Sequence, residues 1–554
     1  MPTITLDKET VLKLSKTKLN DKDLAEKISM MGSDLDEINK DEIIVEIFPN
    51  RPDLLSEQGF ARALSSFLAI NTGLKEYKSE KSDYKMIIEE SVKDIRPYTA
   101  CAVVKNIKMD DEKIREIIQI QEKLHVTYGR NRKKTAIGIY PLDKISFPIY
   151  FKAMLPNEIK FQPLESNKEM TGKEILEKHP TGKEYAHLLE GKKLYPIFVD
   201  SNNKVLSMPP VINSHDTGRI TEDTKDVFIE CSGFDKNVLS KCLNMIVTAL
   251  SDMGGKIYSM EIENKHENTK YILPDFEPEK MKIDPEYVKK VLGIDMKEKE
   301  IRTNLEKMGY GVKGTEVLIP CYRSDVISQI DLVEDIAIAH GFDNFSPTIP
   351  NVSTIGKESD IEKFKQKLRE VLIGLGMFET KTYNISSSVQ QTEMMHSKIS
   401  LVKLANSLTV DYDCLRAWII PNLMDVLKNN KRYDYPQKYF DLGRIFKETG
   451  NDETGITEHE RLAVAICDKE ADYTKIKKVL DTLFKAIGMN YIIKADQHDS
   501  FVPGRVARIS IGKKDIAYIG EIHPKVLENF EIEMPVCALE INITELFEIF
   551  SENN

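Results

Sequence analysis

Apolar and polar residues alternate with two different periods along the chain, and these periods predict both helices and strands. Residues 54–68 and 113–124 carry apolar side chains at helical spacing, whereas residues 3–6 and 99–104 have the pattern of short strands. From about residue 95 to 260, short runs of both kinds are broken by proline and glycine. This mixture predicts an α+β architecture.

Signals for helix starts become sharper between about residues 270 and 348. The pair Asp284-Pro285 predicts an N-cap followed by the first helical position. The segment 295–298 resembles a capping box, which predicts a second helix, and residues 316–320 form an expected strand. The apolar residues expected to face inward from the second helix are Ile301, Leu305 and Met308.

Four carboxylates follow this strand within the segment 325–335. If a helix begins near Ser328, three of them share one helix face and the fourth lies just before the helix. A cation among them would relieve their repulsion, and oxygen donors without a nearby His or Cys suit Mg²⁺ better than zinc. The other interpretation is a solvated acidic helix start, stabilised by the helix dipole. The four residues are Asp325, Asp331, Glu334 and Asp335.

An earlier segment repeats the scaffold around these carboxylates. Residues 47–53 and 319–325 both show an apolar strand, then Pro, Arg, any residue and Asp, and an apolar helix follows each. The scaffold alone does not require the acidic residues, because the first copy lacks them, and this favours a specific role for them. At the positions of Asp331, Glu334 and Asp335, the first copy has Gly59, Arg62 and Ala63.

Composition limits the class of protein. With 554 residues, the chain is long enough for several domains that each bury a core. It has no apolar run of 18 residues and no secretory signal, and its seven cysteines include no C-x-x-C pair. The net charge of −11 disfavours nonspecific coating of nucleic acid but permits local basic patches. We therefore expect a multidomain cytoplasmic protein that makes no contact with a membrane.

Motifs in the last third of the chain resemble a known family. Residues 404–416, 420–423 and 439–446 look like the class II synthetase-like module found in the β subunits of phenylalanyl-tRNA synthetases. The resemblance covers nearly the whole chain, and the absence of an appended anticodon-binding domain makes it similar to the archaeal and eukaryotic form. Other segments that match, in the order of the family, are 46–53, 130–133, 206–214 and 323–340.

The resemblance implies a division of the α+β chain into four domains, the last of which is a degenerate class II synthetase-like module with an antiparallel sheet. The small third domain would carry the acidic cluster. The expected domains are an N-terminal helix/strand domain at 1–92, an editing-like α+β domain at 93–265, the small domain at 268–348 and the synthetase-like module at 355–554.

The resemblance also implies a role in attaching phenylalanine to tRNA(Phe). The complex would use ATP and Mg²⁺, with the ATP and phenylalanine sites on a separate α subunit in an α2β2 tetramer. In this chain Arg416 matches the context of a class II ATP-binding arginine, but residues 502–506 and 518–524 lack the glycine-rich pattern needed on the adenylate side. The module is therefore expected to support assembly rather than catalysis. The four carboxylates would bind Mg²⁺ in a structural or subunit-linking role.

A second reaction is implied for the editing-like domain, namely hydrolysis of tyrosine wrongly attached to tRNA(Phe). Such a reaction is needed because a pocket for phenylalanine cannot fully reject an analogue that only adds a hydroxyl. The basic residues 130–134 are candidates for contact with the tRNA backbone, or else form an exposed loop. Polar candidates for the hydrolytic site, none of which forms a triad by spacing, are Ser214, His215, Glu230 and Asp235.

A different class of function is a freestanding RNA-binding or editing-like protein that has no ligase partner. Copurification with a chain that carries intact class II motifs distinguishes this alternative from a ligase subunit.

Overall fold

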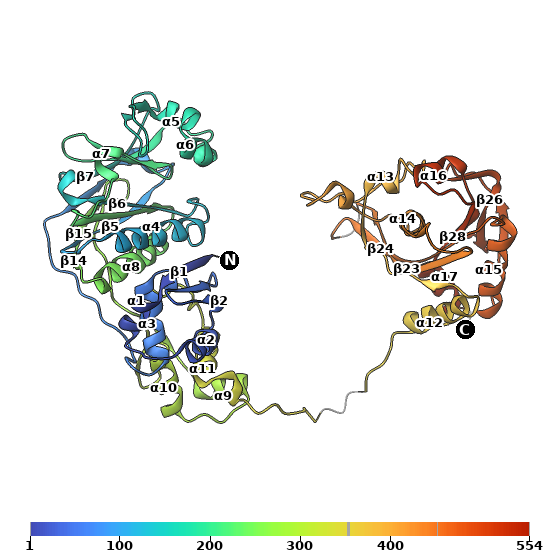
Figure 1. Ribbon diagram of the computed structural model, residues 1–554, viewed down its shortest axis with the longest axis horizontal. Helices are drawn as coiled ribbons and strands as arrows, with labels where there is room; N and C mark the ends of the chain where they lie inside the picture. Colours follow the sequence, from blue (N-terminus) through green and yellow to red (C-terminus); the bar gives the residue numbers. More distant parts are fainter. Residues whose placement is uncertain (1, 352–354, 451–452, 553–554) are drawn as a thin grey trace. The chain divides into compact units, whose positions relative to one another are not determined.

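The computed structural model describes residues 2–351, 355–450 and 453–552. The chain forms two compact units, Met1–Ile349 and Pro350–Asn554, which are called here the N-terminal and C-terminal units. Figure 1 shows each unit as sheets covered by helices.

The first part of the N-terminal unit is a three-stranded antiparallel sheet, in the order β1-β3-β2, packed with three helices. The first helix begins after Asp7, whose side chain accepts a hydrogen bond from the backbone N–H of Thr10. The third helix buries Phe60, Ala61 and Leu64. The elements are β1 (Thr3–Asp7), α1 (Lys8–Ser15), α2 (Asp21–Met30), β2 (Asp34–Ile38), β3 (Glu42–Glu46) and α3 (Glu57–Phe67).

Two sheets pack against each other in the middle of the N-terminal unit. The four-stranded sheet has the order β14-β5-β13-β6, and the seven-stranded sheet has the order β12-β11-β10-β7-β4-β15-β16. Along β5, Ala100, Ala102 and Val104 face the helices α4 and α8. Cys101 and Val103 face the seven-stranded sheet, because successive side chains of a strand point to opposite sides. Both sides of the four-stranded sheet are therefore buried.

The strands of the seven-stranded sheet include β4 and β16, which lie just outside the expected segment 93–265. The elements of the four-stranded layer are β5 (Tyr98–Lys105), α4 (Asp111–Val126), β6 (Thr135–Pro141), β13 (Val227–Gly233), α8 (Lys236–Asp252) and β14 (Lys256–Tyr258). The other elements are β4 (Lys85–Ile88), β7 (Ile149–Met154), β8 (Lys160–Phe161), β9 (Met170–Thr171), α5 (Gly172–Lys178), α6 (Pro180–Tyr185), β10 (Tyr195–Val199), β11 (Val205–Met208), β12 (Ile212–Asn213), α7 (His215–Gly218), β15 (Met260–Asn264) and β16 (Thr269–Leu273).

A second three-stranded sheet, in the order β17-β19-β18, ends the N-terminal unit together with three helices. The predicted start of α9 is confirmed, because the side chain of Asp284 accepts from the N–H of Glu286 and Pro285 is the first helical residue. The elements are β17 (Glu279–Lys282), α9 (Pro285–Leu292), α10 (Glu298–Lys307), β18 (Gly311–Lys313), β19 (Glu316–Ile319) and α11 (Gln329–His340).

The predicted capping box at residues 295–298 is wrong, although the helix exists and buries the three predicted apolar residues Ile301, Leu305 and Met308. Asp295 accepts a hydrogen bond from Lys289 Nζ at 2.8 Å instead of capping. The carboxylate that reaches back to the helix start is Glu300, which accepts from the backbone N–H of Lys297 at 2.9 Å.

The C-terminal unit is built on a seven-stranded sheet in the order β20-β23-β24-β28-β27-β26-β25, antiparallel except for the pairing of β20 with β23. Along β24, Leu462, Val464 and Ile466 belong to a core with α12, α15 and α17. The alternating residues Ala463 and Ala465 belong to a second core with α14 and α16. This architecture, together with the N-terminal unit, confirms the predicted α+β fold class.

The elements of the C-terminal unit are α12 (Asp360–Gly374), β20 (Phe378–Glu379), β21 (Ile385–Ser386), α13 (Ser388–Gln391), β22 (Cys414–Leu415), α14 (Ile420–Asn430), β23 (Gln437–Glu448), β24 (Ile456–Cys467), α15 (Tyr473–Ala486), β25 (Ile492–Ala495), β26 (Phe501–Ile511), β27 (Lys514–Ile522), α16 (Pro524–Asn529), β28 (Val536–Asn542) and α17 (Ile543–Glu552).

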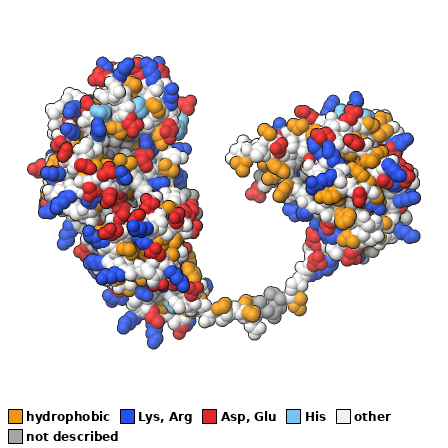
Figure 2. All heavy atoms as spheres, in the orientation of Figure 1, with side chains coloured by type: hydrophobic (Ala, Val, Ile, Leu, Met, Phe, Trp, Pro, Cys, Tyr) orange, Lys and Arg blue, Asp and Glu red, His pale blue; other side chains and the backbone are white. Residues whose placement is uncertain are grey.

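Charged side chains of both signs are interspersed over the face of each unit that Figure 2 shows. That face therefore presents no broad surface of a single charge among the described residues. Of the helices in the described part of the chain, none is both long and apolar enough to cross a membrane.

Candidate functional site

A cavity of about 150 Å³ lies in the middle part of the N-terminal unit. Strands β6, β11, β12 and β13, helices α4 and α6 and the turn at residues 209–211 all contribute to its wall. The residues used in the argument below are Gln121, His125, Arg132, Ser207, Asn213 and Glu230.

The buried carboxyl of Glu230 is the acidic group of this cavity. Only 2% of the residue is exposed, and its Oε2 atom has no hydrogen-bond partner among the described residues. Burial raises the pKa of Glu230 to about 8, although a hydrogen bond from Tyr140 and the charge of Arg96 act in the opposite direction. At neutral pH this carboxyl is therefore largely protonated, and it can donate as well as accept a hydrogen bond.

Tyr140 and Ser207 form a polar group with this carboxyl. The hydroxyl of Tyr140 lies 2.8 Å from Ser207 Oγ and 3.1 Å from Glu230 Oε1. A phenol has one proton, so Tyr140 donates to one of these two atoms at a time. Burial also raises the pKa of Tyr140 well above its ordinary value, which keeps the phenol neutral. The group can thus rearrange its hydrogen bonds when a polar ligand enters.

Gly138 makes room for this polar group. It pairs with Glu230 across β6 and β13. A Cβ atom at this position would lie 2.2 Å from the hydroxyl of Tyr140 and 2.5 Å from Glu230 Oε1. Glycine is therefore required here by the close approach of two side chains rather than by backbone conformation.

Two further side chains shape the cavity without being free to react. The ring of His125 is buried, its Nε2 accepts from the backbone N–H of Ile137 at 2.8 Å, and Nδ1 faces Glu122. Burial lowers the pKa of His125, so the ring is neutral and both nitrogens are engaged. Arg132 donates to the carbonyl oxygen of Val211 at 2.8 Å and thereby holds the turn at 209–211 against the cavity.

Of the four residues that the sequence suggested for a hydrolytic site, the structure brings only Glu230 to the cavity. Ser214 is buried beside it but does not line it, and its backbone N–H pairs with Leu206. His215 begins the short helix α7, where Nδ1 lies 3.5 Å from Asp216. Asp235 caps α8 by accepting from the N–H groups of Asn237 and Val238. These three placements count against direct roles in hydrolysis.

In the basic segment 130–134, a turn directs one arginine to the cavity and leaves other basic residues at the surface. Three successive residues, 130 to 132, have positive φ, and this turn carries Arg132 inward to the cavity. Arg130 and Lys133 remain exposed. Contact of this segment with tRNA stays a prediction for these two exposed residues.

All four carboxylates of the acidic segment line one cavity of about 890 Å³, here called the acidic cavity. The helix α11 begins after Ser328, as predicted, and Asp331 accepts from the N–H groups of Ile327 and Ser328 through Oδ2. Glu334 is exposed one turn further along. The other two carboxylates, Asp325 and Asp335, are largely buried.

Arg323 neutralises the buried pair. Its Nε and Nη2 donate to the two oxygens of Asp325 at 2.8 and 2.7 Å, and Nη2 also donates to Asp335 at 2.8 Å. The hydroxyl of Tyr310 donates to the same oxygen of Asp335. Among the described residues, no group of three or more Asp, Glu, His or Cys side chains is arranged to hold one metal ion. Two of the four carboxylates are thus engaged by a guanidinium, and Asp331 and Glu334 are the ones that remain accessible to a cation.

In the C-terminal unit, Arg416 is a buried structural residue. It is fully buried, and Nη1 donates to Asp441 at 3.0 Å and to Thr382 at 2.7 Å. A Cβ at Gly443 would lie 2.0 Å from its Nη2, so the guanidinium is packed against the strand β23. It is not placed to bind the phosphates of a nucleotide.

Comparisons with known proteins agree along the chain. Three family models match: the B3/4 domain at residues 83–246, the tRNA synthetase B5 domain at 281–342 and the phenylalanyl tRNA synthetase beta chain CLM domain at 346–543. The phenylalanine–tRNA ligase beta subunit of Thermococcus sibiricus is 39% identical over 497 residues, which is 89% of this chain and 88% of that protein. The subunit of the same name from Archaeoglobus fulgidus is 37% identical over 530 residues, 94% of this chain and 95% of that protein.

A solved structure agrees with these sequence matches. An N-terminal fragment of the phenylalanyl-tRNA synthetase beta subunit from Pyrococcus horikoshii has 38% identity and a TM-score of 0.58, and covers 61% of this chain and 99% of the fragment. The fold and the matched domains define a subunit of an aminoacyl-tRNA synthetase. The chain belongs to the family of phenylalanine–tRNA ligase beta subunits. The resemblance found in the sequence is thereby confirmed.

Proposed function

We propose that this chain hydrolyses tyrosine from mischarged Tyr-tRNA(Phe) in the cavity of Glu230, while a partner α subunit carries out the ligation. The observation that carries the proposal is the buried carboxyl of Glu230, with one oxygen that lacks a partner among the described residues. A phenol hydroxyl can satisfy that oxygen, whereas a phenylalanine ring leaves it unsatisfied. Sites built on such a group discriminate strongly against the ligand that lacks the hydroxyl.

The small size of the cavity supports an amino-acid side chain as its occupant. With about 150 Å³ it can hold an aromatic ring, whereas it is below the usual size of pockets for larger organic ligands. Ser207 and Asn213 at its wall offer further polar contacts. Among the described residues at the cavity, no side-chain nucleophile lies beside a general base. The proposed nucleophile is therefore a water molecule held by the polar groups.

The test is release of tyrosine from Tyr-tRNA(Phe) by the complex of this chain with its α subunit. We expect Glu230→Met, which keeps a similar volume but removes both hydrogen-bonding atoms, to slow this release by roughly tenfold or more, which corresponds to the loss of one strong hydrogen bond. The matched control is Asp235→Asn, which changes a carboxylate on the same segment that does not line the cavity. Equal rates for Glu230→Met and the wild type would exclude this assignment.

The assembly is proposed as an α2β2 tetramer that binds tRNA(Phe) and uses ATP and Mg²⁺, with ligation on the α subunits. Arg416 supports only the placement of ligation on the α subunits, because its buried guanidinium is paired with Asp441. Mass measurement of the purified complex, with phenylalanine charging assayed for each subunit alone and for both together, tests the proposal. A monomer of this chain with no effect on charging would instead favour a freestanding editing-like protein.

Mg²⁺ binding is proposed for the acidic cavity, in a structural or subunit-linking role. The exposed Glu334 and the partly exposed Asp331 are the accessible oxygen donors, whereas Asp325 and Asp335 are held by Arg323. Calorimetric titration of the complex with MgCl₂ should give weaker binding for Glu334→Gln than for the wild type. Glu298→Gln, which changes an exposed carboxylate on α10, serves as the control. Unaltered affinity in Glu334→Gln contradicts the proposal.

A cytoplasmic location is proposed from the family to which the chain belongs and from its cysteines. A tRNA ligase works where tRNA is charged, and all seven cysteines are free and buried, which suits a reducing compartment. Fractionation of cells followed by detection of the chain tests this location.

A further inference from the structure

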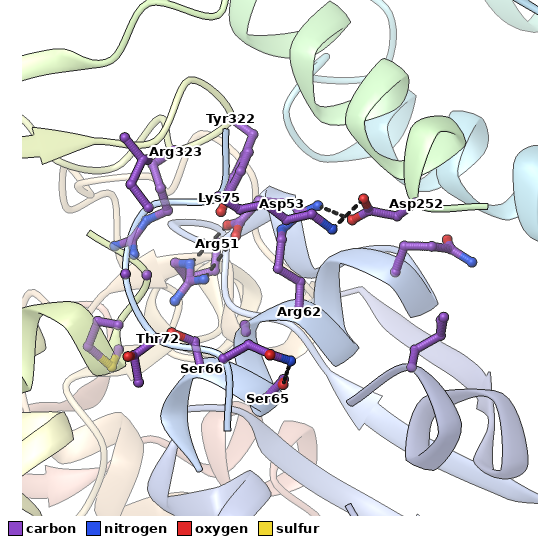
Figure 3. A pocket seen from close by; sticks show the side chains of 18 of the residues that line it. Arg51, Asp53, Arg62, Ser65, Ser66, Thr72, Lys75, Asp252, Tyr322 and Arg323 are labelled. Atoms are coloured by element: carbon purple, nitrogen blue, oxygen red, sulfur yellow. Dashed lines mark hydrogen bonds and ion pairs between the residues drawn. The ribbon is translucent and has the colours of Figure 1, made fainter. Parts of the chain in front are cut away.

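A third cavity, of about 450 Å³, lies in the N-terminal unit and is lined by basic side chains. Figure 3 shows it from close by. We call it the basic cavity. Its cationic lining residues are Lys16, Arg51, Arg62, Lys75 and Arg323, and its acidic ones are Asp53 and Asp252.

The basic cavity occupies the same place in the first scaffold copy as the acidic cavity does in the second. In both copies the central strand of the sheet leads to an arginine that forms a bidentate ion pair with an aspartate. These pairs are Arg51 with Asp53 and Arg323 with Asp325. The helix α3 presents Arg62 to the basic cavity. At the matching position, α11 presents Glu334 to the acidic cavity.

Each cavity also borrows the arginine-bearing segment of the other copy. The basic cavity is completed by Arg323 from the second copy, and the acidic cavity by Arg51 from the first. The two cavities are therefore equivalent sites in a repeated scaffold, and the exchange of a few side chains has given them opposite charge. A repeated fold alone explains the shape of the basic cavity but not its charge.

The cationic side chains of the basic cavity outnumber the carboxylates that pair with them by one. Five cationic side chains and two carboxylates line it, and one of the cations, Arg323, is also paired with Asp325 and Asp335 of the acidic cavity. Asp53 is engaged by Arg51, and Asp252 is shared between Arg62, at 2.8 Å, and Lys75, at 2.6 Å. The guanidinium groups of Arg51 and Arg323 interact unfavourably with each other. An anion between them would relieve this repulsion.

Arg323, a residue of the cavity wall, has one buried donor without a partner among the described residues. Arg323 is 3% exposed, and its Nη1 atom is buried without a hydrogen-bond acceptor among the described residues. The other guanidinium nitrogens of Arg323 are held by Asp325 and Asp335. Native proteins rarely leave such a donor unsatisfied, and an unsatisfied donor at a cavity commonly marks an absent ligand, ion or water.

We propose that the basic cavity binds a small phosphorylated metabolite, with its phosphate group at Arg51 and Arg323. The Nε and Nη2 atoms of both arginines already donate to carboxylates, so the phosphate would accept from their remaining Nη1 groups in charge-assisted hydrogen bonds. The volume of about 450 Å³ is far larger than phosphate alone needs and lies in the range of pockets for small organic ligands. Apolar wall residues suit the organic part of such a ligand; they are Leu14, Leu74 and Met308.

The occupant is a small molecule rather than the backbone of an RNA. The two arginines that would hold the phosphate are largely buried, with 11% and 2% of their side chains exposed. Contacts to an RNA backbone are made by exposed basic side chains, which track a continuous strand. The site does not depend on Glu230 or on the hydrolytic cavity.

Calorimetric titration of the full chain with inorganic phosphate, ribose 5-phosphate and AMP tests the proposal. We expect saturable binding at one site per chain, with the organic esters at least tenfold tighter than inorganic phosphate. Unacylated tRNA(Phe) should not displace ribose 5-phosphate. Absence of saturable binding by all three probes, or displacement by tRNA, would overturn the proposal.

Two variants locate the site. Lys16→Gln removes an exposed cationic group from the cavity wall, and Ala63→Leu fills part of the cavity without changing its charge. We expect each to weaken binding of ribose 5-phosphate by roughly threefold to tenfold. Lys13→Gln is the matched control. Lys13 is exposed in the last turn of α1, the helix that Lys16 caps, but it does not line the cavity. Equal affinities for all three variants would show that the ligand binds elsewhere and would overturn the assignment.

Discussion

At the scale of single residues, the buried carboxyl of Glu230 links stability to pH. Burial raises its pKa to about 8 from an ordinary value of 4.5, so the folded chain holds a proton that the unfolded chain releases between these values. Its contribution to stability is therefore complete below about pH 4.5 and is lost as the pH rises through about 8.

Glu230→Gln removes this titration. We expect the free energy of unfolding to fall less steeply for the variant than for the wild type as the pH rises from about 5 to 9, with a difference on the order of a few kcal/mol. Urea denaturation at several pH values measures it. Glu116, whose pKa is also raised to about 8, titrates in both proteins and cancels in the comparison. Parallel pH profiles would contradict the prediction.

Gly138 gives a second test at the residue scale. In Gly138→Ala the new methyl group would meet Tyr140 and Glu230, so one or both must move out of the cavity. We expect release of tyrosine from Tyr-tRNA(Phe) to slow by roughly tenfold or more. A loss of about 1.4 kcal/mol of transition-state stabilisation by the displaced polar group has this effect on the rate. Gly374→Ala, where an added Cβ would meet nothing within 4 Å, is the control. An undisturbed rate in Gly138→Ala would show that the polar group is not used.

The residues of this site illustrate how far sequence reasoning extends. Glu230 was predicted because it lies near a segment matched to a family. Tyr140 and Ser207 were not predicted, because they come from separate strands and meet Glu230 only through tertiary packing. A signal was present in the alternation of β6, which places Gly138 and Tyr140 on one side of the strand, but the facing strand cannot be read from local periodicity.

At the scale of elements, Asp235 acts on the helix that it begins. It accepts from two backbone N–H groups at the start of α8, so Asp235→Ala should lower the free energy of unfolding by about 1 kcal/mol. Release of tyrosine by the folded variant should stay at the wild-type rate. Urea denaturation and the release assay check the two expectations. Asp223→Ala, on an exposed loop, should leave stability unchanged within about 0.5 kcal/mol.

The start of a helix was predictable where the sequence offered one possible capping residue, and was missed where it offered two. The start of α11 at Ser328 followed from the spacing of the carboxylates, and Asp331 confirms it by capping. The start of α10 was misplaced because Glu298 and Glu300 both have plausible spacing from a preceding residue. In the structure Asp295 pairs with Lys289 of α9 instead of capping α10, and the sequence spacing alone does not show this contact.

At the scale of the whole molecule, the N-terminal unit should be able to fold by itself. Each hydrophobic core of the described residues lies within one unit, and the Pyrococcus horikoshii fragment matches the N-terminal unit in extent. We expect residues 1–349 to unfold cooperatively and, on the proposed function, to release tyrosine from Tyr-tRNA(Phe). Thermal unfolding followed by circular dichroism and the release assay check this. A fragment without a cooperative transition would show that the two units depend on each other for folding.

The position of Arg323 connects the two cavities of the repeated scaffold. One guanidinium pairs with Asp325 and Asp335 of the acidic cavity while it lines the basic cavity. An anion in the basic cavity that draws the guanidinium away leaves the two carboxylates less neutralised. A cation that takes the place of the guanidinium beside these carboxylates frees the guanidinium to bind an anion. Thermodynamic linkage makes this effect reciprocal, so whatever occupies one cavity sets the affinity of the other by the same factor. The duplication of a small fold has thereby produced a pair of sites that can report on each other through a single side chain.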